Sequence, residues 1–131
     1  MRMLIVDDDF TTRLLLQGML KNYGMAHIAV NGREAVDAVR TAIETDKPYN
    51  LICLDIMMPG MDGQTALKQI REMEEEAGVG RLDRAKIVMT TSLGDQENVL
   101  KAIAGHCDGY LVKPYSKSAL LDRLRELELI W

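Results

Sequence analysis

The stretch "MLIVDDDFTT", Met3 to Thr12, sets four apolar residues directly before three aspartates. The apolar run has the length and composition of a buried strand. Carboxylates next to one another repel, so three in a row at the end of such a strand need a reason. Either they cap the helix that follows, as aspartates often do, or they share a site with residues from other parts of the chain.

Strands and helices are predicted to alternate along the whole chain. Runs of apolar and β-branched residues indicate strands, and apolar residues three and four positions apart indicate helices. Five strand–helix repeats predict a doubly wound α/β fold, in which a parallel five-stranded sheet carries helices on both faces. The expected strands are 2–6, 25–30, 49–55, 86–92 and 108–114, and the expected helices are 10–22, 31–44, 64–76, 95–105 and 115–129.

Apolar stripes predict which helix faces turn inward. Asn31 is expected to cap the second helix through its side-chain oxygen. The stretch 78–85 is expected to be an exposed linker inside the domain, and Leu121 to lie exposed beside the last stripe. The stripes are Leu14, Leu15, Met19 and Leu20; then Ala35, Val36, Val39 and Ile43; then Leu67, Ile70 and Met73; and last Leu120, Leu124 and Leu127.

The composition predicts one folded domain over residues 1–131, with no output domain visible. Hydrophobic residues make up 47% of the chain and charged residues 27%, which argues against disorder. A net charge of −4 offers no basic footprint for nucleic acid. No apolar stretch approaches the roughly 20 residues that span a bilayer, and the N-terminus lacks the layout of a signal peptide. The expected location is the cytoplasm.

Polar residues stand where the predicted strands end. In a doubly wound sheet the ligand site lies beyond the carboxyl ends of the strands, which meet at one edge. The three aspartates of the opening stretch should therefore lie near the residues that end the third, fourth and fifth strands. These are Asp55, the run Thr90, Thr91 and Ser92, and the pair Lys113-Pro114.

This set of groups suits phosphoryl chemistry with a divalent cation. Three carboxylates in one pocket repel, and Mg²⁺ relieves the repulsion because it prefers hard oxygen ligands. Lys113 adds a second positive charge and Thr91 a hydroxyl. Together they match the equatorial oxygens of a phosphoryl group in transfer, and a remaining carboxylate could attack it to form an acyl phosphate.

Four motifs, "LIVDDD", "LICLDIMMPGMDG", "IVMTTS" and "GYLVKPY", occur in this order over nearly the whole chain. With them the sequence resembles the receiver domain of bacterial two-component response regulators. The resemblance implies a flavodoxin-like fold with strand order 2-1-3-4-5. It also implies a phosphoacceptor, rather than an enzyme, that takes a phosphoryl group from a histidine kinase or a phosphotransfer protein.

The resemblance assigns roles residue by residue. Asp55 resembles the phosphoacceptor, Asp8 the Mg²⁺ ligand and Asp7 its partner in the acidic pocket. The Mg²⁺ would also take the backbone carbonyl of Met57. An output partner, or a second copy in a dimer, would read phosphorylation on the surface of the fourth helix, fifth strand and fifth helix. The conserved hydroxyl, lysine and aromatic switch residues correspond to Thr91, Lys113 and Tyr110.

Some positions depart from the family pattern. Ser92 stands where many members carry alanine, and the stretch 72–86 is long and charged. Met57 and Leu93 lie two residues after Asp55 and Thr91, where the resemblance places side chains beside the path of a hydrolytic water. Neither side chain can orient a water, so we expect slow hydrolysis, unless their exposed ends swing aside.

Two other interpretations remain open on the sequence alone. The sequence also has an Asp-x-Asp pattern, Asp7 and Asp9, and a Gly94-Asp95 pair. Haloacid-dehalogenase-type phosphatases have similar motifs, and in that interpretation Asp7 would be the nucleophile. However, Lys113 follows the Gly-Asp pair here, whereas in that family the lysine precedes it, and Asp55 stays unexplained. Mapping the phosphorylated residue separates the two. A receiver fold that binds partners without phosphorylation is the other alternative, and a failure to bind Mg²⁺ would favour it.

Overall fold

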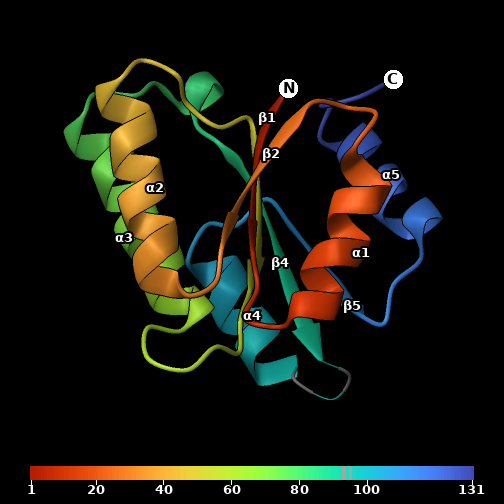
Figure 1. Ribbon diagram of the computed structural model, residues 1–131. Coiled ribbons are helices and arrows are strands. Elements are labelled where there is room, and N and C mark those ends of the chain that lie inside the picture. The colour runs from red at the N-terminus through yellow and green to blue at the C-terminus, as the bar shows by residue number, and fades with distance from the viewer. Residues whose placement is uncertain (93, 95) are drawn as a thin grey trace.

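The computed structural model describes residues 1–92, 94 and 96–131 (Figure 1). The expectations about Leu93 and Asp95 lie outside the described residues. Five parallel strands form one sheet in the order β2-β1-β3-β4-β5, which confirms the predicted topology. The strands are β1 Arg2–Val6, β2 Met25–Ala29, β3 Leu51–Asp55, β4 Lys86–Ser92 and β5 Gly109–Lys113.

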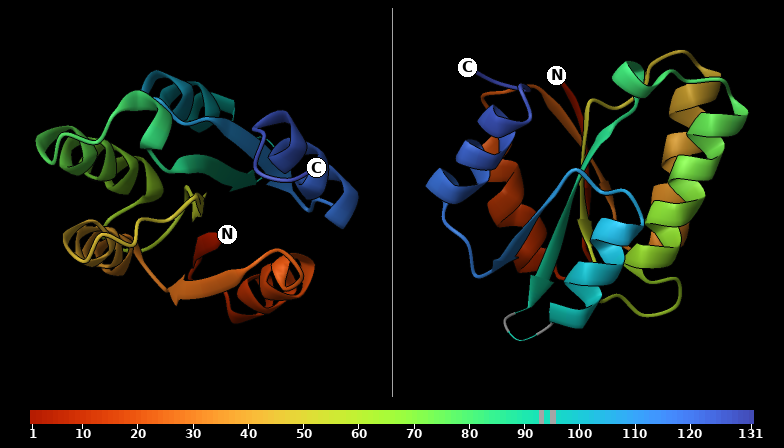
Figure 2. Two further views of the ribbon diagram at one scale, coloured as in Figure 1. Left: turned by 90° about the horizontal axis from the view of Figure 1, so that it is seen from above. Right: turned by 180° about the vertical axis from the view of Figure 1, so that it is seen from behind.

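Helices cover both faces of the sheet. In Figures 1 and 2, α1 and α5 lie on one face, and α2, α3 and α4 lie on the other. This is the doubly wound arrangement that alternating strands and helices require. The helices are α1 Phe10–Leu20, α2 Gly32–Glu44, α3 Gly63–Glu76, α4 Gln96–Ala104 and α5 Lys117–Glu126, and a short 3-10 helix, η1, spans Arg81–Asp83.

The central strands are buried from both sides. Met3, Leu4 and Ile5 of β1 have no exposed surface, and all five residues of β3 are buried. Parallel registry pairs Val6 with Leu54, and Asp55 with Thr90. The registry therefore brings the residues that end β1, β3 and β4 to the same edge of the sheet, at the bottom of Figure 1.

Side-chain caps fix where four of the helices begin. Asp9 accepts a hydrogen bond from the backbone N–H of Thr12, and Asn31 caps α2 in the same way, as predicted. Each cap satisfies an N–H group that has no partner within its helix. The role of Asp9 is thus the ordinary one of starting α1, and it stands apart from that of its two neighbours. Asp62 and Ser116 cap α3 and α5.

Predictions for two helix faces are wrong in part, although Leu20 of α1 and Leu120 and Leu124 of α5 are buried as predicted. In α1 the buried residues are Leu16 and Leu20, whereas Leu14 and Leu15 are 56% and 58% exposed. The helix is rotated so that the pair four residues apart faces the sheet. In α5, Leu121 is only 8% exposed and packs with Leu120 and Leu124. The expectation that Leu121 is exposed fails because the inward stripe of α5 is wider than a single row of side chains.

The linker between α3 and β4 is tied down at its end. Leu82 is 94% exposed, as expected for this segment, but Glu74 at the end of α3 is buried. Glu74 accepts hydrogen bonds from Arg71 at 2.7 Å and from the backbone N–H of Ala85 at 2.8 Å. Arg71 also donates to Asp108 at 2.7 Å. This network of Arg71, Glu74 and Asp108 joins α3, the linker and the loop before β5.

We predict that Leu121→Asp destabilises the fold by about 3 kcal/mol or more, because it buries an unpaired carboxylate. Urea unfolding followed by circular dichroism measures the change. Leu15→Asp is the matched control and should cost less than about 1 kcal/mol, since that side chain faces solvent. Equal losses in the two variants would contradict the packing described for α5.

Candidate functional site

An acidic cluster occupies the carboxyl edge of the sheet. Asp7 and Asp8 follow β1, and Asp55 ends β3. Each of the three offers a carboxylate oxygen within 4.8 Å of the others. Asp7 and Asp55 are buried, at 1% and 5% exposure, whereas Asp8 faces solvent. The structure therefore brings together the three aspartates that the sequence assigned to one site.

Asp7 is held by three neighbours. One carboxylate oxygen accepts the backbone N–H of Asp9 at 2.9 Å, and the other accepts the Lys113 ammonium at 2.9 Å. The Arg13 guanidinium donates to the backbone carbonyl of Asp7 at 2.9 Å. A buried carboxylate is costly unless it has such hydrogen-bond partners. Asp7 is thus held in a fixed position at the base of the cluster.

Asp55 is less well compensated than Asp7. Its Oδ1 lies 3.4 Å from Nζ of Lys113 and accepts a hydrogen bond of 3.3 Å from the backbone N–H of Met57. Burial, followed by the neighbouring charge of Asp7, raises the pKa of Asp55 to about 6, although Lys113 opposes this rise. Burial alone would lower the pKa of Lys113, but its contacts with Asp7 and Asp55 raise it overall. The lysine therefore stays charged.

The loop after β3 is shaped by a close approach of two backbone segments. The N–H of Gly63 donates to the carbonyl of Ile56 at 2.9 Å. A Cβ atom at position 63 would overlap the carbonyl oxygen of Asp55. Glycine is therefore required where α3 begins, directly beside the residue that ends β3. The Asp62-Gly63 pair thus couples the helix cap to the position of Asp55.

The remaining predicted residues surround the cluster. Thr91 is buried at 1% exposure, one residue beyond Thr90, which pairs with Asp55. Met57 is 60% exposed, and Ser92 is also exposed. Tyr110 lies on β5 and is 38% exposed. Thr91 and Ser92 thus lie at the same end of β4 as the partner of Asp55, Met57 lies in the loop after Asp55, and Tyr110 lies on β5, which pairs with β4.

Arg13 was not identified from the sequence. It lies on α1, and its side chain reaches back over the loop to the carbonyl of Asp7 while it stacks near the ring of Phe10. Arginine on an exposed helix surface is common, so its position gave no signal. Its contact with the site depends on the rotation of α1, which a stripe of leucines does not define.

The acidic cluster can hold a hard cation. Its donors are carboxylate oxygens, which match the ligand preference of Mg²⁺. Asp8 and Asp55 face the same small volume, and Lys113 neutralises only part of the negative charge. The arrangement leaves a surplus of negative charge beside one carboxylate, Asp55, whose proton affinity is raised.

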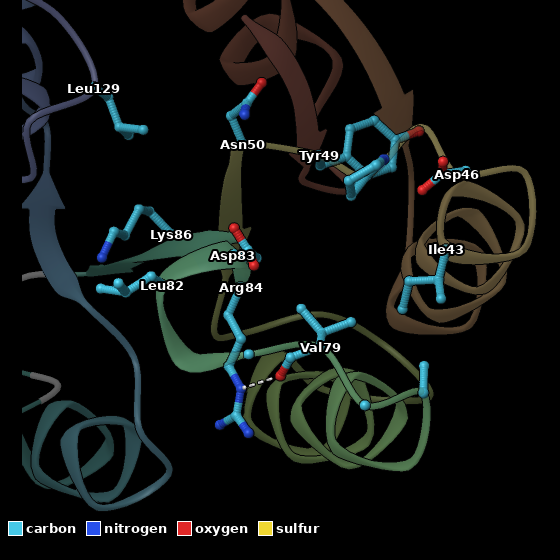
Figure 3. A pocket seen from close by; sticks show the side chains of 14 residues that line it. Ile43, Asp46, Tyr49, Asn50, Val79, Leu82, Asp83, Arg84, Lys86 and Leu129 are labelled. Carbon is cyan, nitrogen blue, oxygen red and sulfur yellow. Dashed lines mark hydrogen bonds between the residues drawn. The ribbon is translucent and has the colours of Figure 1, made fainter.

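A separate hollow lies at the opposite, amino edge of the sheet (Figure 3). It has a volume of about 530 Å³ and includes Tyr49, Arg84 and Leu129 in its walls. Arg84 donates to the backbone carbonyl of Val79 at 3.5 Å in its wall. The hollow shares no residue with the acidic cluster, so the chemistry of the cluster is confined to the carboxyl edge.

The described residues include no helix with the length and apolar character needed to cross a bilayer.

Comparisons with known proteins agree with this geometry. The model of the response regulator receiver domain family matches residues 3–125. The chain is 35% identical to the chemotaxis protein CheY of Halobacterium salinarum, covering 96% of this chain and 95% of that protein.

Two solved structures share the fold. The receiver domain of the histidine kinase CKI1 from Arabidopsis thaliana, complexed with Mg²⁺ and BeF₃⁻, is 30% identical with a TM-score of 0.79, covering 97% of this chain and 89% of that one. The CheX–CheY–BeF₃–Mg²⁺ complex of Borrelia burgdorferi is 27% identical with a TM-score of 0.81, covering 97% and 88%. With its sheet order, its acidic edge and these matches, the chain belongs to the response regulator receiver domains of two-component signalling.

Proposed function

We propose that this receiver accepts a phosphoryl group on Asp55, in a reaction that depends on Mg²⁺, from the phosphohistidine of a kinase or phosphotransfer protein. The observation that carries the proposal is the convergence of Asp55 with Asp7, Asp8 and Lys113 at one edge of the sheet. An isolated aspartate at a strand end would be a turn residue. One flanked by two carboxylates and a shared lysine is a reactive position.

Mg²⁺ fits this site by the chemistry of its donors. Asp8 and Asp55 would hold it, with Asp7 behind them and the backbone carbonyl of Met57 as a further oxygen ligand. When bound, Mg²⁺ would neutralise the carboxylates and the oxygens of the incoming phosphoryl group. Mg²⁺ is present in the related CKI1 and Borrelia structures, which supports the same metal here.

The transfer would need a nucleophile on Asp55 and positive charge beside the transferred group. A carboxylate oxygen of Asp55 attacks the phosphorus, the bond from phosphorus to the donor histidine nitrogen breaks, and the histidine leaves with that electron pair. The Lys113 ammonium, 3.4 Å from Asp55, is placed to compensate charge on the transferred group. Thr91, which follows the partner of Asp55 on β4, would offer its hydroxyl. The product is an acyl phosphate.

Phosphorylation would be read on the surface formed by α4, β5 and α5. Movement of Thr91 toward the phosphoryl group would leave space that Tyr110, now 38% exposed, could enter. Leu121 is buried and therefore does not contribute an exposed side chain to that surface. Its exposed apolar residues are Leu100, Ile103, Tyr110 and Val112, which would meet an output partner or a second copy.

The same proposal places the protein in the cytoplasm as a phosphoacceptor, and not as an enzyme with a separate substrate. It needs no direct contact with nucleic acid. The haloacid-dehalogenase alternative would instead put the phosphoryl group on Asp7, whose two carboxylate oxygens are already engaged by Asp9 and Lys113.

The first prediction concerns the acceptor. Asp55→Asn should abolish labelling by a phosphorylated kinase or by acetyl phosphate in Mg²⁺, because the amide cannot attack phosphorus. Asp37→Asn, at an exposed aspartate on α2, is the control and should label normally. Mass spectrometry of the labelled peptide identifies the residue. A phosphoryl group found on Asp7 would support the phosphatase alternative.

The second prediction concerns the metal. At ten times its Kd, Mg²⁺ should add about 1.4 kcal/mol to the free energy of unfolding, a shift of several degrees in Tm. Asp8→Ala should lose this shift, and Asp83→Ala, a remote exposed aspartate, should keep it. Coincident melts with and without millimolar Mg²⁺ would mean that the cluster binds no metal and would revive the phosphorylation-independent alternative.

The pH dependence of the metal-free protein follows from Asp55. Its pKa is raised to about 6 from 3.8, so the folded state binds its proton more tightly than the unfolded chain does. The contribution of Asp55 to the free energy of unfolding is fully present below about pH 4 and is lost as the pH rises through about 6. The Mg²⁺ shift should therefore be larger at pH 7.5 than at pH 5, since the metal replaces that proton.

The lifetime of phospho-Asp55 should depend on residue 57. In the Met57→Asn variant the acyl phosphate on Asp55 should be hydrolysed about tenfold faster, because an amide can position a water that a thioether cannot. Loss of radioactive label after removal of the donor gives the rate. Met25→Asn, at an equally exposed methionine on β2, is the control. If Met57→Asn is no faster, the exposed methionine swings aside and does not limit access.

A further inference from the structure

A groove separate from the acidic cluster runs between α3 and α4. Its volume is about 1220 Å³, and residues of the linker that contains η1 form part of its lining. In the view from behind in Figure 2, α3 and α4 stand next to each other with η1 above them. The groove contains none of the aspartates of the site and neither β5 residue of the proposed output surface.

The groove is basic in a protein that is acidic overall. Six lining side chains are basic and three are acidic, against a net charge of −4 for the chain. The positive charge is thus concentrated on one surface, which is how proteins attract and orient a partner of opposite sign. The basic residues are Lys68, Arg71, Arg81, Arg84, Lys86 and Lys101, and the acidic ones are Glu72, Glu75 and Asp108.

Among these basic residues, Arg71 is the one that forms close ion pairs within the described part of the protein. Arg71 forms ion pairs of 2.7 Å with both Glu74 and Asp108 and so makes a rigid floor. Lys101 has a loose pairing of 3.7 Å with exposed Glu97, which is worth little in water. In the part of the chain that the structure describes, no ion pair engages the other four, Lys68, Arg81, Arg84 and Lys86.

Apolar side chains stand at the rim of the same groove. Leu82 of η1 is 94% exposed, and Ile103 of α4 is 51% exposed. Both line the groove, one from the linker and one from the facing helix. The linker is anchored three residues after Leu82, where the backbone of Ala85 is hydrogen-bonded to Glu74 and Arg71. The groove therefore offers apolar contacts between free cations.

The size and chemistry of the groove indicate the kind of occupant. At about 1220 Å³ it is larger than an ordinary small-molecule pocket of about 300–1,000 Å³. Glu72 and Glu75 interrupt the basic residues and would repel a continuous phosphodiester backbone. Among the described residues, the groove lining includes no Phe, Tyr or Trp for base stacking. A peptide segment with both carboxylates and aliphatic side chains satisfies all of these features.

We infer that the groove between α3 and α4 is a docking site for an acidic peptide segment of a partner protein, anchored by aliphatic side chains against Leu82 and Ile103. The groove shares Lys101 and Ile103 of α4 with the proposed output surface, but it contains neither Asp55 nor the β5 residues of that surface. Binding there is expected in the absence of phosphorylation. It is also expected to weaken with salt, because Lys68, Arg81 and Lys101 are exposed.

The test uses a short fluorescein-labelled peptide rich in glutamate and carrying leucine, titrated with the unphosphorylated protein by fluorescence anisotropy. The combined variant Lys68→Glu, Arg81→Glu and Lys101→Glu should weaken binding by about tenfold or more. The control reverses the same number of exposed charges elsewhere, at Lys21, Arg33 and Lys117, and should bind within about twofold of the wild type.

A second pair of variants isolates the apolar contact. Leu82→Ser should weaken the peptide by about threefold to tenfold, and Leu14→Ser, at an exposed leucine on α1, should leave it unchanged. A peptide that fails to bind the wild type overturns the inference, as does equal loss in the groove variant and its charge-matched control. Tighter binding of a labelled oligonucleotide than of the peptide would also overturn it, in favour of nucleic acid.

Discussion

The Lys113 ammonium holds together a group of carboxylates that would otherwise force the carboxyl edge of the sheet apart. It lies 2.9 Å from Asp7 and 3.4 Å from Asp55, so a residue of β5 neutralises charges on β1 and β3. This balance is possible only in a sheet that brings all three strand ends to one edge. One lysine against three carboxylates still leaves excess negative charge. The raised pKa of Asp55 and the fit of the site to a divalent cation both follow from that excess.

Much of the architecture could be predicted because it depends on local periodicity and one topological rule. Alternating strands and helices allow few arrangements, and the handedness of their connections removes most of these. The residues after each strand then meet at one edge without any knowledge of side-chain packing. For that reason Asp7, Asp55, Thr91 and Lys113 could be assigned to one site from sequence, and the cap residue Asn31 from its position before a stripe.

The features that could not be predicted depend on how each helix is rotated and on partners distant in sequence. Three consecutive leucines in α1, residues 14–16, allow more than one inward face, and contact with the sheet selects Leu16 over Leu14 and Leu15. The burial of Leu121 depends on how wide a face of α5 packs against the sheet. Glu74 lies in an acidic run typical of a solvated helix end, yet its partners in the fold, Arg71 and Ala85, make it a buried residue.

The network of Arg71, Glu74 and Asp108 also separates the linker of residues 77–84 from the reactive part of the chain. The backbone of Ala85 is fixed by Glu74, and that of Ile87 by Asp108, at the point where β4 starts. Residues 77–84 can therefore change in length or sequence while β4 enters the sheet at the same register. Thr91, five residues after Lys86 at the start of β4, then keeps its position relative to Asp55 when the linker is changed. The receiver can acquire a new surface at one end of β4 while the chemistry at the other end is left intact.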